Sequence, residues 1–411
     1  MARVSPAPVV LALSLLASSI AIGLTACDAG SGDGAGAGSS VTATGCTPAG
    51  GAALPPTAPD GYYVNGNTVC TSAGKPHLLH GVDRPSLEWS STGANLSAAD
   101  FAAMAGWHAN VVRVALSQDF WLAESPTYAP GYAALVDQVV QWAHAAGMDV
   151  ILDLHWSDRG DYGTAAAQQP MADVHSIEFW KEVATRYKGD GRVFFELYNE
   201  PHDVPADLWL SGGMNESPAY QVAGMQQLHD AVRGVGAENL VIIGGLDYAF
   251  DLSIVASYPV QGHNIVYATH PYNNAPDRQP GDWNSGWGYL TATAPVVVTE
   301  FGDGTGTCSP VWDQTLIPYA DAHNAGWTSW AWFVGGSTPT DLCKFPSLIS
   351  DWSYDTTNEG AVVKAALLGY DDPAAPWPVS DAGSDAGSDA AADSSGDGGA
   401  DAGVDAAADG G

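Results

Sequence analysis

The chain has 411 residues, enough for one large domain or two of ordinary size. It contains 46 acidic residues against 13 lysines and arginines, and its formal net charge is −33. So few basic residues leave no patch able to hold a phosphate backbone, which excludes nucleic acid as an expected partner.

The first 26 residues have the pattern of an export signal. Arg3 precedes an apolar run from Val9 to Leu24 that has no charge, and small residues then lead into Cys27. A run this short is typical of a cleaved signal and not of a spanning helix. The residues before Cys27, Leu-Thr-Ala, resemble the lipobox of bacterial lipoproteins, whose cysteine thiol takes a diacylglycerol. We therefore expect a signal peptide over 1–26 and an exported protein held at the cell envelope or surface by lipid on Cys27, with ordinary cleavage and a free thiol as the alternative.

Two further segments have the composition of flexible chain. Residues 27–60 are rich in Gly, Ala, Ser, Thr and Pro, which predicts a linker between the anchor and a domain. In the tail, 373–411, an aspartate recurs at every fourth position from Asp381 onward. A helix would stack these like charges on one face, so we expect this tail to be disordered. Calcium binding is disfavoured because the spacing lacks the alternating ligands of a calcium loop.

Four cysteines remain besides Cys27. An even number in an exported chain predicts two disulfides, and local pairing is the simplest of the three connectivities. It joins Cys46 to Cys70 and Cys308 to Cys343. Metal binding is disfavoured because these cysteines lack the paired spacing and nearby histidines of a zinc site.

Residues 61–372 predict a single α/β domain, because short apolar runs alternate there with amphipathic stretches. Strands are expected at 78–83, 110–116, 149–155, 193–199, 239–245, 265–270, 295–301 and 327–333. Helices are expected at 97–106, 131–147, 173–188, 217–235, 312–325 and 357–369. Eight such strands in roughly 300 residues predict a (β/α)8 TIM barrel. A doubly wound sheet, the alternative, would carry a Gly-rich loop after its first strand, where this chain has Arg84-Pro85-Ser86.

Polar side chains gather at the predicted strand ends, which is where TIM-barrel enzymes place their chemistry. A solvated rim would scatter charge, whereas here nearly every strand end carries a polar or aromatic side chain. The candidates are Arg113, His155, Asn199, Glu200, His270, Tyr272, Glu300 and Trp332. Metal hydrolysis is disfavoured because no third His or Cys stands at ligand spacing from the two histidines. Serine chemistry lacks its G-x-S-x-G turn.

The Asn199-Glu200-Pro201 segment after the fourth strand and a lone Glu300 after the seventh resemble clan A glycoside hydrolases. The full set of strand-end residues is similar to family five, the cellulase type, over about residues 62–370. This resemblance implies that Glu200 is the acid/base and Glu300 the nucleophile. It also implies that Asn199 binds the sugar 2-hydroxyl, that Arg113 and Tyr272 hold and ionise Glu300, that His155 and His270 line the subsite of the cleaved sugar, and that Trp332 forms its stacking floor.

The expected activity is retaining hydrolysis of a β-linked polysaccharide or oligosaccharide, of the endo-β-1,4-glucanase sort, by a monomer without cofactor or metal. A β-mannanase, a xyloglucanase or an exo-acting β-glycosidase shares this machinery and stays open. A glycan-binding surface lipoprotein without activity is the alternative from another class.

Several finer expectations follow from the strand positions. The two catalytic carboxyls should lie about 5 Å apart, and the proton affinity of Glu200 should be raised by the neighbouring carboxylate. Glu196 and Asp153 lie deeper in the barrel, where buried hydrogen-bonded roles are expected. The contacts of Asp83, where relatives often have Asn, stay open. Five tryptophans in predicted loops are candidates for further subsites: Trp89, Trp121, Trp156, Trp283 and Trp287.

Overall fold

The computed structural model describes residues 40–158 and 168–370. The expected signal peptide, Cys27 and the acidic tail lie outside these residues. Eight parallel strands form a closed barrel in the order β10-β11-β12-β3-β4-β5-β6-β9. Their bounds are β3 (His80–Leu87), β4 (Val111–Ser117), β5 (Asp149–Trp156), β6 (Val193–Glu196), β9 (Val241–Gly244), β10 (Ile265–Thr269), β11 (Val296–Val298) and β12 (Gly326–Ser329). The predicted TIM barrel is confirmed.

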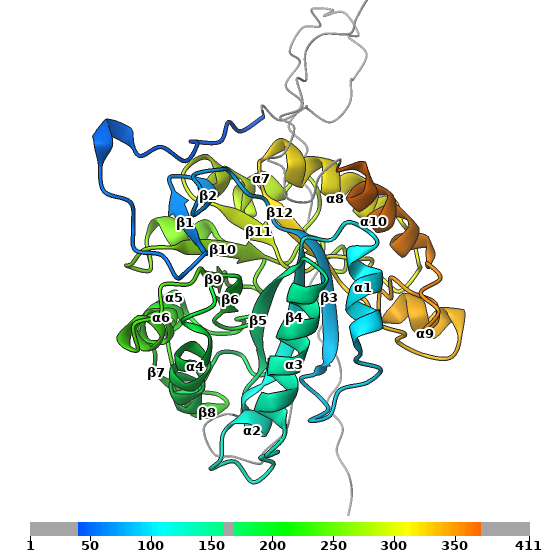
Figure 1. The fold of residues 1–411 in the computed structure, drawn as a ribbon, viewed down its shortest axis with the longest axis horizontal. Coiled ribbons are helices and arrows are strands. Elements are labelled where there is room, and N and C mark those ends of the chain that lie inside the picture. The colour runs from blue at the N-terminus through cyan, green and yellow to red at the C-terminus, as the bar shows by residue number, and fades with distance from the viewer. Residues whose placement is uncertain (1–39, 159–167, 371–411) are drawn as a thin grey trace, which may run out of the picture. The chain divides into compact units, whose positions relative to one another are not determined.

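Helices surround the strands (Figure 1). They are α1 (Ala98–Ala105), α2 (Gln118–Trp121), α3 (Tyr132–Ala145), α4 (Val174–Tyr187), α5 (Ala206–Ser211), α6 (Met225–Gly234), α7 (Trp283–Gly286), α8 (Val311–Ala322), α9 (Pro339–Lys344) and α10 (Asn358–Gly369). Helix α1 begins where the Ser97 side chain accepts a hydrogen bond from the Asp100 N–H, and Asp173 caps α4 in a reciprocal bond pair with Ser176. Among the helices of the described residues, none is both long and apolar enough to cross a membrane.

The predicted helix over 217–235 is wrong in its first part. A hairpin of β7 (Gly213–Glu216) and β8 (Ala219–Val222) precedes α6, which begins at Met225. Pro218 lies in the turn of this hairpin, where its lack of a backbone N–H breaks no hydrogen bond between the strands. In β8, Tyr220 and Val222 are buried and their neighbours exposed, an alternation with the period of a strand.

The barrel interior is apolar at the end where the strands begin. Side chains from successive strands meet there, among them Val111, Ile151 and Phe194. An antiparallel hairpin of β1 (Tyr62–Asn65) and β2 (Thr68–Thr71), which the sequence patterns did not predict, packs Tyr62 and Val64 against this cluster. The hairpin thereby closes the N-terminal mouth of the barrel.

Part of the predicted linker is folded against the barrel. The Val41 N–H donates to the Ala322 carbonyl over 2.9 Å, and the Gly191 N–H donates to the Pro59 carbonyl over 3.1 Å. The Cys46–Cys70 disulfide ties the same segment to β2, with its Cα atoms 5.6 Å apart. The partners in these contacts lie elsewhere in the chain, so the local composition could not indicate them. Composition alone therefore predicted a flexible linker here.

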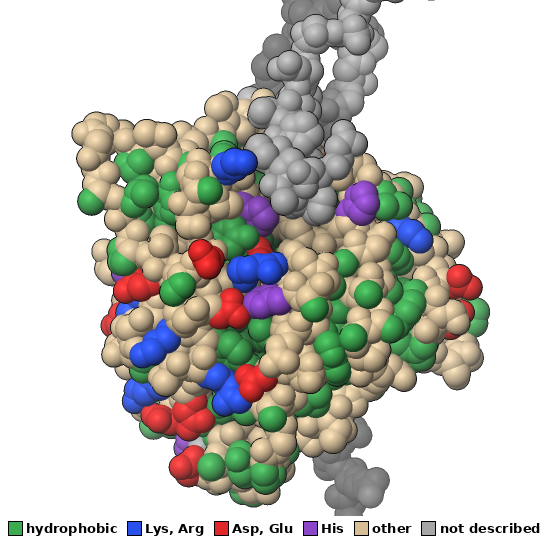
Figure 2. All heavy atoms as spheres, in the orientation of Figure 1, with side chains coloured by type: hydrophobic (Ala, Val, Ile, Leu, Met, Phe, Trp, Pro, Cys, Tyr) green, Lys and Arg blue, Asp and Glu red, His purple; other side chains and the backbone are tan. Residues whose placement is uncertain are grey.

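The second predicted disulfide, Cys308–Cys343, also forms, with its Cα atoms 4.6 Å apart. It joins the loop after β11 to α9, which follows β12. On the face shown in Figure 2, basic side chains lie next to acidic ones and do not gather into one patch.

Candidate active site

The C-terminal mouth of the barrel holds a cavity of about 460 Å³. Five predicted site residues line it: His155, Asn199, Glu200, Tyr272 and Glu300. Arg113 and His270 are fully buried and contact these residues from within the barrel. Strands β4, β5, β6, β10 and β11 supply the seven side chains: Arg113 lies within β4, and the others lie near the C-terminal end of their strand or just beyond it.

Glu300 is held on both carboxylate oxygens. Arg113 donates to its Oε1 over 2.6 Å, and the Tyr272 hydroxyl donates to its Oε2 over 2.9 Å. Burial, followed by the charge of Glu300, raises the pKa of Tyr272 well above its usual range, so this hydroxyl remains a donor. The two donors fix the orientation of the Glu300 carboxyl at the cavity.

Arg113 is the buried cation at the centre of the site. Besides Glu300 it contacts Glu196 at 2.5 Å, Asp153 at 3.0 Å and Asp83 at 3.8 Å. Burial raises the pKa of Glu196, but the Arg113 charge and His270 outweigh it and bring the value to about 2. At Asp83 and Asp153 burial dominates and raises the pKa well above the usual range. Glu196 and Asp153 thus have the buried, hydrogen-bonded positions expected of them, and Asp83 lies against Arg113.

Glu200 has a different environment from Glu300. His270 Nδ1 lies 3.1 Å from its Oε1, and the Gln168 amide donates to its Oε2 over 2.6 Å. Burial raises the pKa of Glu200, but the hydrogen bond and charge of His270, the hydrogen bond from Gln168 and the charge of His155 together outweigh it, and the net shift is downward. The expected rise in the pKa of Glu200 is therefore wrong, because His270, contributed by a different strand, contacts its carboxyl directly.

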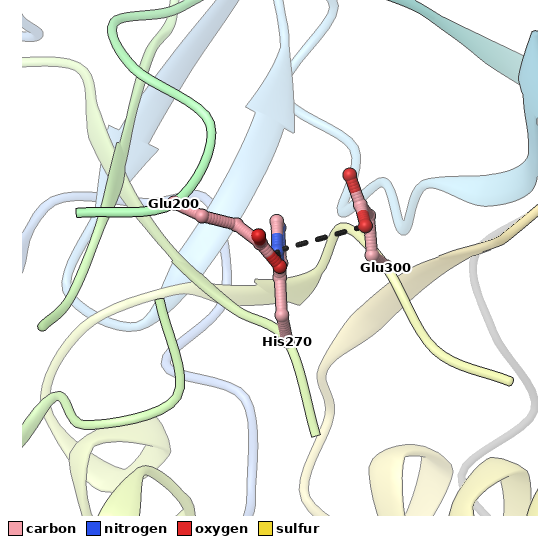
Figure 3. Close-up of side chains that lie close together, drawn as sticks. All are labelled: Glu200, His270 and Glu300. Atoms are coloured by element: carbon pink, nitrogen blue, oxygen red, sulfur yellow. Dashed lines mark hydrogen bonds and ion pairs between the residues drawn. The ribbon is translucent and has the colours of Figure 1, made fainter. Parts of the chain in front are cut away.

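His270 lies between the two glutamates (Figure 3). Its Nδ1 is also 3.8 Å from Glu300 Oε2, and its Nε2 is 2.9 Å from the Thr299 hydroxyl. Burial lowers the pKa of His270, but the charge of Glu300 and the bonds to Glu196 and Glu200 raise it to about 10. Oxygens of Glu200 and Glu300 and a nitrogen of His270 lie within 4.8 Å of one another. The raised pKa of His270 favours its protonated form, which places a proton beside both carboxyls.

Asn199 and His155 are oriented by buried partners. The Asn199 side-chain oxygen accepts from Arg113 over 2.7 Å, which turns its amide nitrogen toward His155 Nε2, 3.3 Å away. His155 Nδ1 lies 2.7 Å from Asp153. Both residues line the cavity.

Trp332 does not form the cavity floor. Its indole is fully buried, donates to Asp100 over 2.8 Å and packs on Trp107. Strand β12 ends at Ser329, four residues before its predicted end, so the alternation of strand side chains no longer applies at Trp332. Trp330 lines the cavity instead and stacks on His155 with ring centroids 5.5 Å apart.

The five tryptophans proposed as further subsites do not line the cavity either. Trp121, Trp283 and Trp287 are buried in packing contacts, and neither Trp89 nor Trp156 is among the described residues lining the cavity. Sequence reasoning missed Gln168, Tyr248 and Arg278, which do line it. They lie in loops beyond the strand ends, where no period or motif distinguishes them.

Comparisons with known proteins agree with this geometry. The family described as cellulase, glycosyl hydrolase family 5, matches residues 70–336. An endoglucanase from Clostridium saccharobutylicum is 26% identical over 313 residues, covering 74% of this chain and 64% of that protein. An endoglucanase from Paenibacillus polymyxa is 25% identical over 344 residues, covering 71% of this chain and 83% of that protein.

Solved structures share the fold. A β-glucanase from Saccharophagus degradans has a TM-score of 0.59 at 21% identity, covering 77% of this chain and 94% of that one. The catalytic domain of a Thermobifida fusca endoglucanase, in complex with cellotetraose, has a TM-score of 0.58 at 20% identity, covering 75% and 97%. With the family match spanning more than half of its residues, the chain belongs to glycosyl hydrolase family 5, the cellulase family of glycoside hydrolases.

Proposed function

We propose that the chain hydrolyses internal β-1,4 bonds of a glucan with net retention, using Glu300 as nucleophile and Glu200 as acid/base. The spacing of the two carboxyls carries the proposal, because their oxygens lie within 4.8 Å. A retaining pair stands about 5–5.5 Å apart, whereas an inverting pair leaves roughly 6.5–9.5 Å for a water. The short spacing supports the retaining assignment.

Glu300 attacks the anomeric carbon and forms a covalent glycosyl intermediate. Arg113 and Tyr272 each bind one of its carboxyl oxygens and so hold the carboxyl in place at the cavity. Asn199, whose amide is held between Arg113 and His155, lines the cavity and is placed to bind a sugar hydroxyl next to the reacting carbon. The indole of Trp330 offers an apolar face to the sugar ring, as pyranose binding requires.

Glu200 must donate a proton to the leaving oxygen, and His270, whose pKa is raised to about 10, is placed to supply it. The two groups are 3.1 Å apart, close enough for direct transfer from Nδ1 to Oε1. Formation of the bond between Glu300 and the sugar removes a negative charge that raises the pKa of His270. Proton release from His270 and attack by Glu300 therefore assist each other. In the second half-reaction Glu200 returns to the anionic form and activates water.

A substrate panel tests the glucan assignment. We expect the enzyme to release reducing sugar from carboxymethyl cellulose and to lower its viscosity early in the reaction, as internal cleavage does. Faster release from β-mannan or xyloglucan would favour those alternatives, and glucose as the first product would indicate exo action. Binding of glucan without release of sugar would contradict an enzymatic role and support the glycan-binding alternative.

We also propose that lipid on Cys27 anchors the mature protein to the cell envelope. The test is to express the full chain in a bacterial host and to separate its membrane and soluble fractions. The proposal rests on the export-signal pattern of residues 1–26. Cys27→Ala should move the protein from the membrane fraction to the soluble fraction. An unchanged distribution of this variant would contradict the anchor.

A further inference from the structure

Both oxygens of the Glu200 carboxyl have protein partners. His270 takes Oε1, and the Gln168 amide takes Oε2 over 2.6 Å while also lying 3.5 Å from the Glu200 carbonyl. A leaving oxygen or an attacking water must reach one of these carboxyl oxygens. Because His270 is fully buried and Gln168 only partly so, Gln168 is the partner that can yield its place.

We propose that Gln168 is a positioning residue for Glu200: its amide holds Oε2 toward the cavity while the site is empty and gives up this atom to the glycosidic oxygen when substrate binds. This inference rests on the proposed role of Glu200 as acid/base. Gln168 lines the cavity beside Glu200, from the chain that follows β5. No motif marks it, and its position relative to Glu200 comes from the fold alone.

The chemistry of an amide makes Gln168 more than a spacer. Its N–H donates to a carboxylate and so favours the anionic form of Glu200 over the acid. The other charged or titratable groups around Glu200 are His270 and His155, which favour its anion, and Asp153, Tyr248, Tyr272 and Glu300. Losing the Gln168 donor should therefore raise the pKa of Glu200 while leaving these neighbours in place.

Two variants separate positioning from simple packing. Gln168→Met keeps the length of the side chain but removes the donor, and Gln168→Glu places a second carboxyl against the first. With a cello-oligosaccharide, the basic side of the kcat/KM profile should move upward by about one pH unit in Gln168→Met and further in Gln168→Glu. With 2,4-dinitrophenyl cellobioside, whose leaving group needs no proton, the basic limb of the kcat/KM profile should not shift. Gln141→Met, on the exposed face of α3, is the matched control and should change neither profile.

A uniform loss of activity at all pH values, without a shift of the profile, would overturn the inference. Carbon-13 NMR of glutamate-labelled protein gives a second readout that does not depend on turnover. The carboxyl resonance of Glu200, assigned by its absence in Glu200→Gln, should titrate at higher pH in folded Gln168→Met than in the parent protein. An unchanged titration of Glu200 in Gln168→Met would refute the role of Gln168. If the titration moves as expected but the parent enzyme cleaves neither glycoside, only the proposed function is refuted.

Discussion

The two mouths of the barrel are built from the same strands but have opposite chemistry. At the N-terminal mouth the inward side chains are apolar, and the β1–β2 hairpin covers them with Tyr62 and Val64. At the C-terminal mouth the inward side chains are an arginine, two histidines and five carboxyls around an open cavity.

Single strands show the change of character along the barrel axis. In β4 the inward position moves from Val111 to Arg113, and in β5 from Ile151 to Asp153 and then His155. Apolar burial stabilises the fold, whereas a buried charge costs free energy unless it is paired. One end of the barrel therefore contributes stability, and the other uses some of it to hold a reactive set of charges. Substitutions at the two ends should accordingly separate activity from stability.

The largest effect is expected at Glu300. Glu300→Ala should lower kcat roughly 10⁵-fold, because the covalent step is lost. Azide in the space left by the side chain should restore turnover of 2,4-dinitrophenyl cellobioside and yield the inverted glycosyl azide, identified by proton NMR. The folded state should keep its circular dichroism spectrum. A wild-type enzyme whose first product has the inverted anomeric configuration would contradict the nucleophile assignment.

Glu200→Ala should have a smaller effect that depends on the leaving group. Loss of proton donation should lower kcat/KM on cello-oligosaccharides by roughly 10³-fold. On the dinitrophenyl glycoside the loss should be about tenfold or less, because that leaving group departs as the anion. Equal losses on both substrates would argue that Glu200 binds sugar without transferring a proton.

The apolar mouth should show the reverse behaviour. Phe194 is fully buried and meets Tyr62 edge-on, with ring centroids 5.2 Å apart. Phe194→Ala leaves a cavity and should lower the free energy of unfolding by about 3–5 kcal/mol, measured in urea. Its kcat/KM in dilute buffer should match the parent enzyme, since the catalytic groups lie at the other mouth. A large loss of activity in folded protein would show that the two ends are coupled.

The smallest effect concerns a supporting carboxyl at the catalytic end. Glu359, in the first turn of α10, accepts a hydrogen bond from the Asp303 N–H over 2.7 Å. Burial raises the pKa of Glu359 to about 7, although the Asp303 N–H opposes the rise. The folded state then keeps a proton that the unfolded chain has lost, so the stabilisation from this group falls as pH rises from about 4.5 to 7.

Glu359→Gln should remove this contribution. The slope of unfolding free energy against pH should become less negative in that window by up to about 1.4 kcal/mol per pH unit. Chemical denaturation at several pH values measures it. An identical slope in parent and variant would mean that Glu359 is ionised in the folded protein.

Much of this protein was determined by its sequence alone. Strand and helix periods are local, so they predicted the eight strands and nearly all the long helices, and strand ends placed Glu200 and Glu300 at one mouth. The pairing of four cysteines was also predicted from their order. The β1–β2 hairpin and the tethering of residues 41–60 were not, because their partners lie far away in the chain.

Only the tertiary structure decided which residues line the cavity and which groups contact the two glutamates. Trp330 and Trp332 are equivalent in sequence pattern, but β12 ends at Ser329, and the chain then turns one indole into the cavity and the other into the core. The direction of the Glu200 pKa shift depended on His270, contributed by a different strand, and the contact with Gln168 depended on a loop. Electrostatic interactions vary with distances of a few ångströms between elements, and a linear pattern of residues does not contain those distances.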